Sequence, residues 1–215
     1  YKQDREDAPE LVVGGYASPQ IIDREKHLIR REAMAADLPR FLAHPKYRNA
    51  NIVHSNIQVG EVLPRWCHPE TKECWETKVD DIGLFAVVKI RTDKYRPVIV
   101  DKVIHDILKG DLAAFSISGD APFESRRHVC DGGVCFWLID KIEFYEFTIC
   151  EQGVNQDAKF AILSKSAFCV DGSCPVNMES VLGKQGVSLP QEPKPPKPRP
   201  LAGEQAKDPR VADVA

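Results

Sequence analysis

The sequence contains neither a long hydrophobic run nor an excess of charge of either sign. Its apolar stretches, such as residues 84–88, are far shorter than the roughly 20 residues that a membrane-spanning helix needs. Its 29 lysine and arginine residues nearly balance 32 aspartate and glutamate residues, which gives a formal net charge of −3. A nucleic-acid-binding protein would carry a basic excess, and a disordered solvating chain would be more acidic. We therefore expect neither a membrane nor a nucleic acid among its partners.

The N-terminus also lacks the features of a secretory leader. The chain opens at Tyr1 with a charged segment instead of a short basic region followed by an apolar one. Its seven cysteines are an odd number, whereas secreted disulfide frameworks are usually shorter chains with an even number. We expect no signal peptide, and thiols that are reduced by default in an intracellular setting.

Proline is concentrated near the C-terminal end of the chain. Six prolines fall within residues 189–200, where they alternate with lysine and arginine. Such a stretch cannot form the interior of a helix or a sheet, so we expect a disordered or polyproline II tail over residues 189–215. The hydrophobic content of 43% is ample for one packed domain, which we place at residues 9–166. Residues 167–188 form a cysteine-containing extension between the two.

Hydrophobic periodicity predicts more strands than helices. Alternating or continuous apolar runs predict strands, and a 3.6-residue period ending at Gly110 predicts the second of two helices. Pro39 is expected to interrupt the first helix or to mark a second one. The predicted strands are residues 11–16, 51–63, 75–79, 83–90, 112–118, 134–139 and 141–150, and the predicted helices are residues 32–42 and 98–108. This pattern indicates an α+β, mostly β domain with a curved sheet or closed barrel and flanking helices.

Two polar residues on predicted strands have side chains suited to acid–base or nucleophilic chemistry. His54 is one, because histidine is the usual general base near neutral pH, although a lone histidine on a strand is commonly structural. Ser116 is the other, held between the bulky residues Phe115 and Ile117. Gly119 would let a reacting carbonyl group approach backbone N–H groups that could hold an oxyanion. The alternative to a catalytic role is that residues 115–119 are simply the end of an edge strand that passes into a turn.

Glu146 is a third candidate, on a later predicted strand. By a period of two it shares a face with Phe144, Thr148 and Cys150, whereas Glu143 lies on the other face. A carboxylate among such neighbours is costly unless it is paired, and a histidine is a natural partner for it. The alternative is that this face of the strand is partly exposed to solvent. Histidine, serine and glutamate thus come in this order on three predicted strands.

Several strings between residues 10 and 165 resemble the prohead proteases of tailed bacteriophages and archaeal viruses, whose fold is shared with the herpesvirus maturational protease, assemblin. The strings are VVGGYA at 12–17, IVH at 52–54, FSISGDA at 115–121, FYEFTIC at 144–150 and GVNQDA at 153–158. The third is similar to the family's fSIgGkA and the fourth to its L.EiSLV. The chain departs from the family where Ser118 replaces a glycine, Thr148 replaces a serine, and residues 153–154 replace Pro-Ala. Ser118 is therefore a rival nucleophile.

The resemblance implies an assemblin-like fold and a role for each of the three candidates. Ser116 would attack the scissile carbonyl, His54 would take its proton, and Glu146 would orient the imidazole. Because related viral proteases use a second histidine in the third role, His105 and His128 are alternatives to the glutamate.

The resemblance also implies where the oxyanion would be held. A backbone N–H near Ser118 or Gly119 would donate to it. Arg126 or Arg127 could assist, because the assemblin relatives use an arginine pair after the nucleophile. This chemistry requires neither a metal nor a cofactor.

The function implied by the resemblance is that of a serine endopeptidase of viral capsid maturation. Its substrates would be the internal scaffold, the N-terminal extension of the major capsid protein and the protease itself. It would act inside the prohead in the host cytoplasm and would self-associate. Two alternatives are a catalytically inactive scaffold or assembly protein with the same fold, and a zinc-stabilised binding module.

The cysteines form three closely spaced pairs and one single residue. The pairs are Cys67 with Cys74, Cys130 with Cys135, and Cys169 with Cys174. Local disulfides at hairpin tips, a zinc site that joins two pairs, and free thiols are the competing interpretations, although the usual C-x₂-C knuckle of zinc sites is absent. The single residue, Cys150, raises the alternative of cysteine–histidine catalysis, but its apolar strand end offers no activating neighbour.

Overall fold

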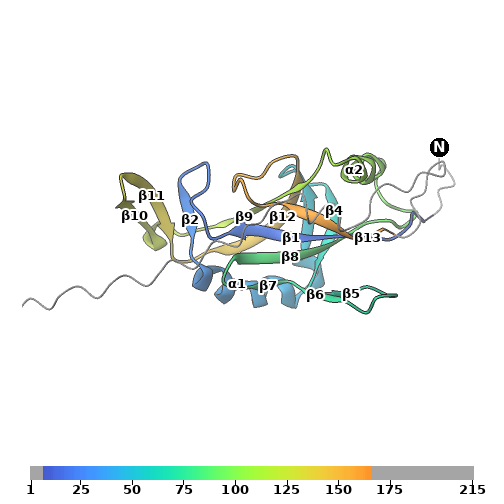
Figure 1. The fold of residues 1–215 in the computed structure, drawn as a ribbon, viewed down its shortest axis with the longest axis horizontal. Coiled ribbons are helices and arrows are strands. Elements are labelled where there is room, and N and C mark those ends of the chain that lie inside the picture. Colours follow the sequence, from blue (N-terminus) through green and yellow to red (C-terminus); the bar gives the residue numbers. More distant parts are fainter. Residues whose placement is uncertain (1–6, 166–215) are drawn as a thin grey trace, which may run out of the picture. The chain divides into compact units, whose positions relative to one another are not determined.

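The computed structural model describes residues 7–165 of the chain (Figure 1). The predicted extension 167–188, which contains Cys169 and Cys174, and the predicted tail 189–215 lie outside the described residues. Neither α-helix of the described part is long and apolar enough to cross a membrane.

A sheet of eight strands forms the centre of the described residues (Figure 1). The strands are β1 (Leu11–Pro19), β3 (Asn49–Ile52), β4 (Gln58–Leu63), β7 (Lys78–Val79), β8 (Gly83–Ile90), β9 (Ala114–Asp120), β12 (Glu143–Cys150) and β13 (Phe160–Lys165). Their order is β13-β1-β8-β4-β3-β12-β9, and β7 pairs with β8. Strand β12 runs parallel to β3, and the other neighbours on this path are antiparallel. Strands β3, β12 and β9 are therefore adjacent, although they are distant in the sequence.

The sheet curls so that its two ends approach each other. The N–H of Phe115 donates to the carbonyl of Ala158 at 2.8 Å, and that of Phe160 donates to Ala113 at 3.1 Å. These bonds join the start of β9 to the start of β13. From Ser116 onward, β9 pairs only with β12 within the described residues. The result is a curled half-barrel, which confirms the predicted curved and mostly β domain.

Two helices contribute apolar faces to the core of the sheet. Helix α1 (Arg31–Ala43) buries Phe41 completely, and α2 (Val98–Lys109) buries residues such as Val103 in the same core. An amphipathic period predicts α2 because one stripe of this helix must leave water. Gly110, with a φ of 88°, ends α2 in the left-handed conformation, as predicted.

Pro39 does not interrupt α1, contrary to the prediction from sequence. A proline at this position removes the N–H that would bond to the carbonyl of Ala35. Both residues are exposed, so water can satisfy that carbonyl. The helix therefore continues for a further turn beyond the proline.

Smaller elements complete the described residues. Strands β2 (His27–Ile29), β10 (Arg126–Asp131) and β11 (Val134–Ile139) form a second sheet in the order β10-β11-β2. A two-stranded hairpin consists of β5 (Arg65–Cys67) and β6 (Cys74–Glu76), and the 3₁₀ turns are η1 (Pro45–Tyr47) and η2 (Phe123–Ser125). Two of the predicted strands, 51–63 and 75–79, are each divided into two.

Both described cysteine pairs are disulfides at hairpins. Cys67 is bonded to Cys74 across β5 and β6, and Cys130 is bonded to Cys135 across β10 and β11. This confirms the local-disulfide interpretation for these four residues. The expectation of reduced thiols is wrong for them, and so is that of a zinc site joining these two pairs, because each pair uses its sulfurs within its own hairpin.

Candidate active site

His54 lies in a tight turn between β3 and β4 rather than on a strand. Val53 and His54 have φ angles of 47° and 51°, in the left-handed region that a β-branched residue such as valine rarely adopts. The N–H of Ser55 donates to Ile52 at 2.9 Å, and the N–H of Ile52 donates to Ile57 at 3.2 Å. The predicted strand 51–63, with His54 on one of its faces, is therefore wrong. The turn instead brings the imidazole over β9 and β12.

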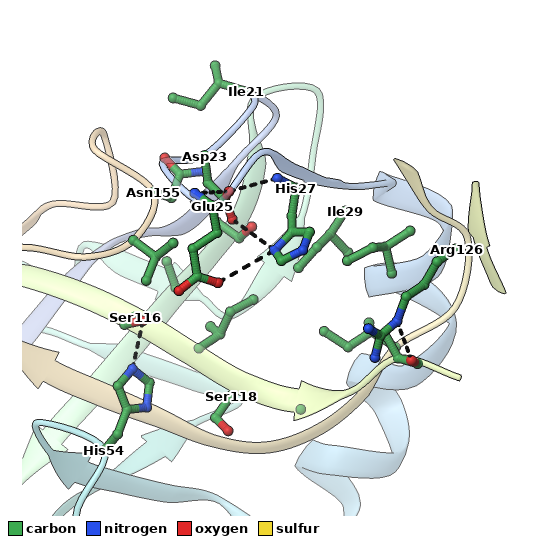
Figure 2. A pocket seen from close by; sticks show the side chains of 18 residues that line it. Ile21, Asp23, Glu25, His27, Ile29, His54, Ser116, Ser118, Arg126 and Asn155 are labelled. Atoms are coloured by element: carbon green, nitrogen blue, oxygen red, sulfur yellow. Dashed lines mark hydrogen bonds and ion pairs between the residues drawn. The ribbon is translucent and has the colours of Figure 1, made fainter. Parts of the chain in front are cut away.

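The imidazole of His54 contacts the hydroxyl of Ser116. The distance from His54 Nε2 to Ser116 Oγ is 3.0 Å (Figure 2). Ser116 lies on β9 and is only 7% exposed, so its hydroxyl is held among packed neighbours. The pair is within the hydrogen-bond reach that a nucleophile and its general base require.

The other ring nitrogen of His54 faces Glu146. Nδ1 is 3.1 Å from Glu146 Oε1, and the carboxylate side chain is 15% exposed. An ionised carboxylate can only accept hydrogen bonds, so the ring presents Nδ1–H to it and leaves Nε2 to accept from Ser116. The structure thus brings together all three residues that sequence reasoning selected, in the arrangement of a serine–histidine–acid triad.

The prediction that Glu146 shares a face with Phe144 is wrong. Strand β12 has an irregularity in its pairing with β9 between Phe144 and Glu146, which leaves Tyr145 without a partner. One extra residue reverses the alternation, so Phe144 and Phe147 both pack on Phe41, with ring centroids 6.1 and 5.1 Å away. Beyond the bulge, Glu146 faces His54 instead of the core.

Helix α1 holds this bulge in place. Asp37 Oδ2 accepts the backbone N–H of Phe144 at 2.7 Å, and Arg40 Nη2 donates to the Phe144 carbonyl at 2.8 Å. The two side chains also bind each other, with Arg40 Nε 2.6 Å from Asp37 Oδ1. The backbone groups of Phe144 are therefore paired with side chains of a neighbouring helix.

Two polar residues that sequence reasoning did not single out complete the contacts of the carboxylate. Asn51 Nδ2 donates to Glu146 Oε2. Thr148 Oγ1 lies 3.4 Å from Glu146 Oε1 and 3.3 Å from His54 Nδ1. The position of Thr148 on the same strand face as Glu146 is a signal in the sequence, whereas that of Asn51 depends on the pairing of β3 with β12.

A pocket of about 400 Å³ opens beside Ser116 (Figure 2). The lining includes Ser116, Ser118 and Gly119 from β9. Within residues 7–165 the rival nucleophile Ser118 makes no side-chain hydrogen bond with His54, and it lies opposite Glu146 in the strand register. Ser116 is therefore the serine against the imidazole, while backbone groups at 118 and 119 lie along the same pocket wall.

The opposite wall of the pocket carries two acids and a histidine that were not anticipated. Asp23 Oδ1 accepts the backbone N–H groups of Glu25 and His27 at 2.9 and 2.8 Å, which shapes this loop. His27 Nδ1 is 3.6 Å from Glu25 Oε2 and 4.0 Å from Asp23 Oδ2. These side chains lie across the pocket from the Ser116–His54 pair in Figure 2.

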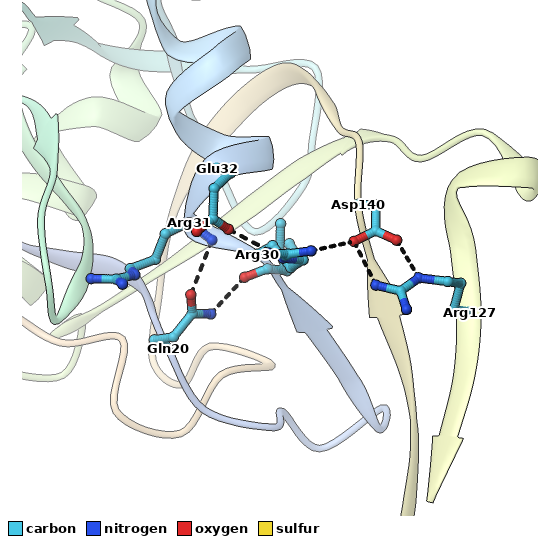
Figure 3. A network of polar contacts seen from close by, with 7 residues as sticks. Gln20, Arg30, Arg31, Glu32, Arg127 and Asp140 are labelled. Carbon is cyan, nitrogen blue, oxygen red and sulfur yellow. Dashed lines mark hydrogen bonds and ion pairs between the residues drawn. The ribbon is translucent and has the colours of Figure 1, made fainter. Parts of the chain in front are cut away.

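The two arginines predicted to assist at the oxyanion occupy different places. Arg126 lines the pocket, where its Nε donates to the Ala121 carbonyl at 2.7 Å (Figure 2). Arg127 is exposed and binds Asp140, which also contacts Arg30 (Figure 3). The hydrogen bond from Arg127 is the main cause that lowers the pKa of Asp140. Arg127 thus belongs to a surface network, and only Arg126 faces the pocket.

Within the described residues, the remaining alternatives from sequence make no hydrogen bond with the triad. His105 is on α2 beside Asp106, at 3.2 Å, and His128 on β10 packs against the ring of Trp137. Cys150 is a free cysteine and is buried on β12. Burial raises the pKa of its thiol to about 11, which disfavours the thiolate that cysteine–histidine catalysis needs.

Comparison of this chain with protein-family models finds no match, and comparison with curated proteins finds no significant one.

Proposed function

We propose that this protein is a serine endopeptidase in which Ser116 is the nucleophile, His54 the general base and Glu146 the group that orients the histidine. One observation carries the proposal: His54 Nε2 lies 3.0 Å from Ser116 Oγ while Nδ1 of the same ring lies 3.1 Å from Glu146. A chance cluster of polar residues rarely satisfies both nitrogens of one imidazole with a hydroxyl and a carboxylate in this order.

The reaction follows from these contacts. Ser116 Oγ forms a bond to the carbonyl carbon of a peptide, and its proton moves to His54 Nε2. The imidazolium, stabilised by Glu146, then gives that proton to the amine as the C–N bond breaks. Water attacks the resulting ester with His54 again as the base, which releases the acid and restores the serine. A backbone N–H near Ser118 or Gly119 is the proposed oxyanion donor.

The surroundings of Ser116 suit an extended polypeptide. Strand β9 has a free edge from Ser116 onward within the described residues, and the pocket runs along it. A substrate chain can add to such an edge as a further strand, so that its carbonyl groups lie beside the serine. A small-molecule hydrolase would not need an open strand edge next to its nucleophile.

The capsid-maturation role is proposed from the resemblance of the strings around His54, Ser116 and Glu146 to the prohead proteases. On that basis the fold is assemblin-like, and the substrates are the scaffold, the N-terminal extension of the major capsid protein and the protease itself. The protein would act inside the prohead and would self-associate there. The sequence strings support this assignment, and the triad geometry agrees with it.

Co-expression with the cognate scaffold and major capsid proteins tests the proposal, with mass spectrometry of the products. Wild type should cleave both, and Ser116→Ala should lose cleavage by several orders of magnitude. Ser118→Ala is the matched control, because this serine lies two residues away on the same strand, and it should still cleave. Cleavage by Ser116→Ala would refute the assignment. A wild type that supports capsid assembly without cleavage would favour the inactive assembly protein.

A further inference from the structure

Asn51, Thr148 and Ser116 occupy one row across three adjacent strands. In the strand register, Thr148 of β12 is paired with Asn51 of β3 on one side and with Ser116 of β9 on the other. The row therefore ends at the proposed nucleophile. His54 follows Asn51 by three residues and folds back over the same part of the sheet.

The polar groups of Asn51 and Thr148 are buried against the triad. Thr148 is fully buried and Asn51 is 8% exposed. Within the described residues, the side-chain hydrogen bonds of both are with Glu146 and, for Thr148, also with His54 Nδ1. Burying an amide and a hydroxyl is costly unless each finds a partner, and here the partners are the carboxylate and the imidazole.

These contacts restrict the carboxylate and the ring to one arrangement. Asn51 occupies Glu146 Oε2, which leaves Oε1 to face His54 Nδ1. Thr148 Oγ1 lies beside both Oε1 and Nδ1, so its hydroxyl can donate to the former and accept from the latter. A carboxylate held by three donors cannot rotate away from the ring without leaving a buried polar group unpaired.

We propose that Asn51 and Thr148 are positioning residues that hold Glu146 and His54 in the reactive arrangement. This inference rests on the proposed function, because it assigns the two residues a role in the activation of Ser116. A purely structural role makes a different prediction: loss of either side chain would lower stability and leave the reactivity of the folded protein unchanged.

The test measures how fast a fluorophosphonate probe labels Ser116 in the full chain, as the maximal rate kinact and the half-saturating concentration KI. The variants Thr148→Val and Asn51→Leu remove the polar groups but keep most of the volume. Each should lower kinact by about tenfold to a hundredfold with KI little changed, because each loses a hydrogen bond to a charged group. Thr148→Ser keeps the hydroxyl and should recover most of the rate.

Thr77, which lies between β6 and β7, provides a matched control. It is 7% exposed, its Oγ1 donates to the Leu63 carbonyl at 2.6 Å, and the same oxygen accepts the Val87 N–H at 3.0 Å. Thr77→Val therefore removes two buried hydrogen bonds far from the triad. It should lower the thermal midpoint and leave kinact at the wild-type value.

The outcomes separate this inference from the proposed function. Labelling of wild type that Ser116→Ala does not abolish would remove the proposed function itself. Labelling at Ser116 that is unchanged in folded Thr148→Val and Asn51→Leu would overturn the positioning role. A rise in KI at constant kinact would also overturn it, since that result means an altered binding surface. If Thr148→Val does not fold, Asn51→Leu and Thr148→Ser carry the comparison.

Discussion

Asp37 is the residue of α1 whose loss tests most directly how the fold turns Glu146 toward His54. Its Oδ2 accepts the backbone N–H of Phe144 at 2.7 Å, and its two oxygens bind Arg40 Nε and Nη2 at 2.6 and 2.9 Å. Asp37→Ala removes all three bonds and leaves the backbone N–H of Phe144 without its partner, next to the bulge in β12.

The magnitude follows from burial. The Asp37 side chain is only 12% exposed, so its bond to the Phe144 N–H is a shielded, charge-assisted one, worth about 1.5–3 kcal/mol. The Arg40 side chain is 45% exposed, so the ion pair adds only about 0.5 kcal/mol. Asp37→Ala should therefore lower the free energy of unfolding by about 2–3.5 kcal/mol. Labelling of Ser116 should also slow, because a β12 free to lose its bulge rotates Glu146 away from His54.

Urea denaturation followed by circular dichroism measures the first effect, and fluorophosphonate labelling of the folded protein measures the second. Asp106→Ala is the matched control, because Asp106 also pairs with a basic residue of its own helix, Lys102, and contacts His105, but within the described residues its side chain accepts no backbone N–H, so its loss should cost less than that of Asp37. Asp37→Asn keeps an oxygen that can accept from Phe144 and should fall between the two. The reasoning fails if Asp37→Ala costs no more than Asp106→Ala and labels at the wild-type rate.

Three further predictions concern single side chains. Burial, and then the hydrogen bond to Asp80, raise the pKa of Tyr16 to about 12. The contribution of Tyr16 to the free energy of unfolding should therefore be fully present below about pH 10 and decline as the pH rises toward 12. Urea titrations at alkaline pH should show a shallower decline for Tyr16→Phe, and equal slopes would contradict this prediction. Because burial raises the pKa of the Cys150 thiol to about 11, iodoacetamide should not modify this residue in the folded protein, which peptide mass mapping would show. Cys150→Ala should also leave the labelling of Ser116 unchanged. Phe41→Ala should cost about 3–5 kcal/mol in chemical denaturation, since this ring is fully buried, and a loss below 1 kcal/mol would be inconsistent with that packing.

The sequence predicts the parts of this protein that depend on regular periodicity. The 3.6-residue period and the glycine after it predict α2 and its end at Gly110. Alternating apolar residues predict most strands of the curled sheet, and the strings around Ser116 and Glu146 identify the polar residues that the structure brings together. These features are local, so one segment at a time is enough to recognise them.

The parts that were not predicted are breaks in periodicity. Nothing in the string around Tyr145 marks the bulge, because the apolar residues on either side are compatible with a regular strand. The contact of Asn51 with Glu146 depends on the parallel pairing of β3 with β12, and the two residues lie 95 positions apart in the sequence. Register between distant strands is a tertiary property, which a single sequence does not reveal.

Among these breaks in strand periodicity, the turn at Val53 and His54 is the one that places the imidazole of the candidate site. A turn chosen for stability alone would carry Asn-Gly, because those residues adopt left-handed φ angles at little cost. Val53 has a φ of 47° and is 62% exposed, so burial of its own side chain does not offset a strain of about 1–2 kcal/mol. The compensation must come from the turn's backbone hydrogen bonds and from the contacts of His54 with Ser116 and Glu146. Backbone strain at and beside His54 is expected if the turn serves to place the imidazole against Ser116 and Glu146, whereas a purely structural hairpin would gain nothing from it.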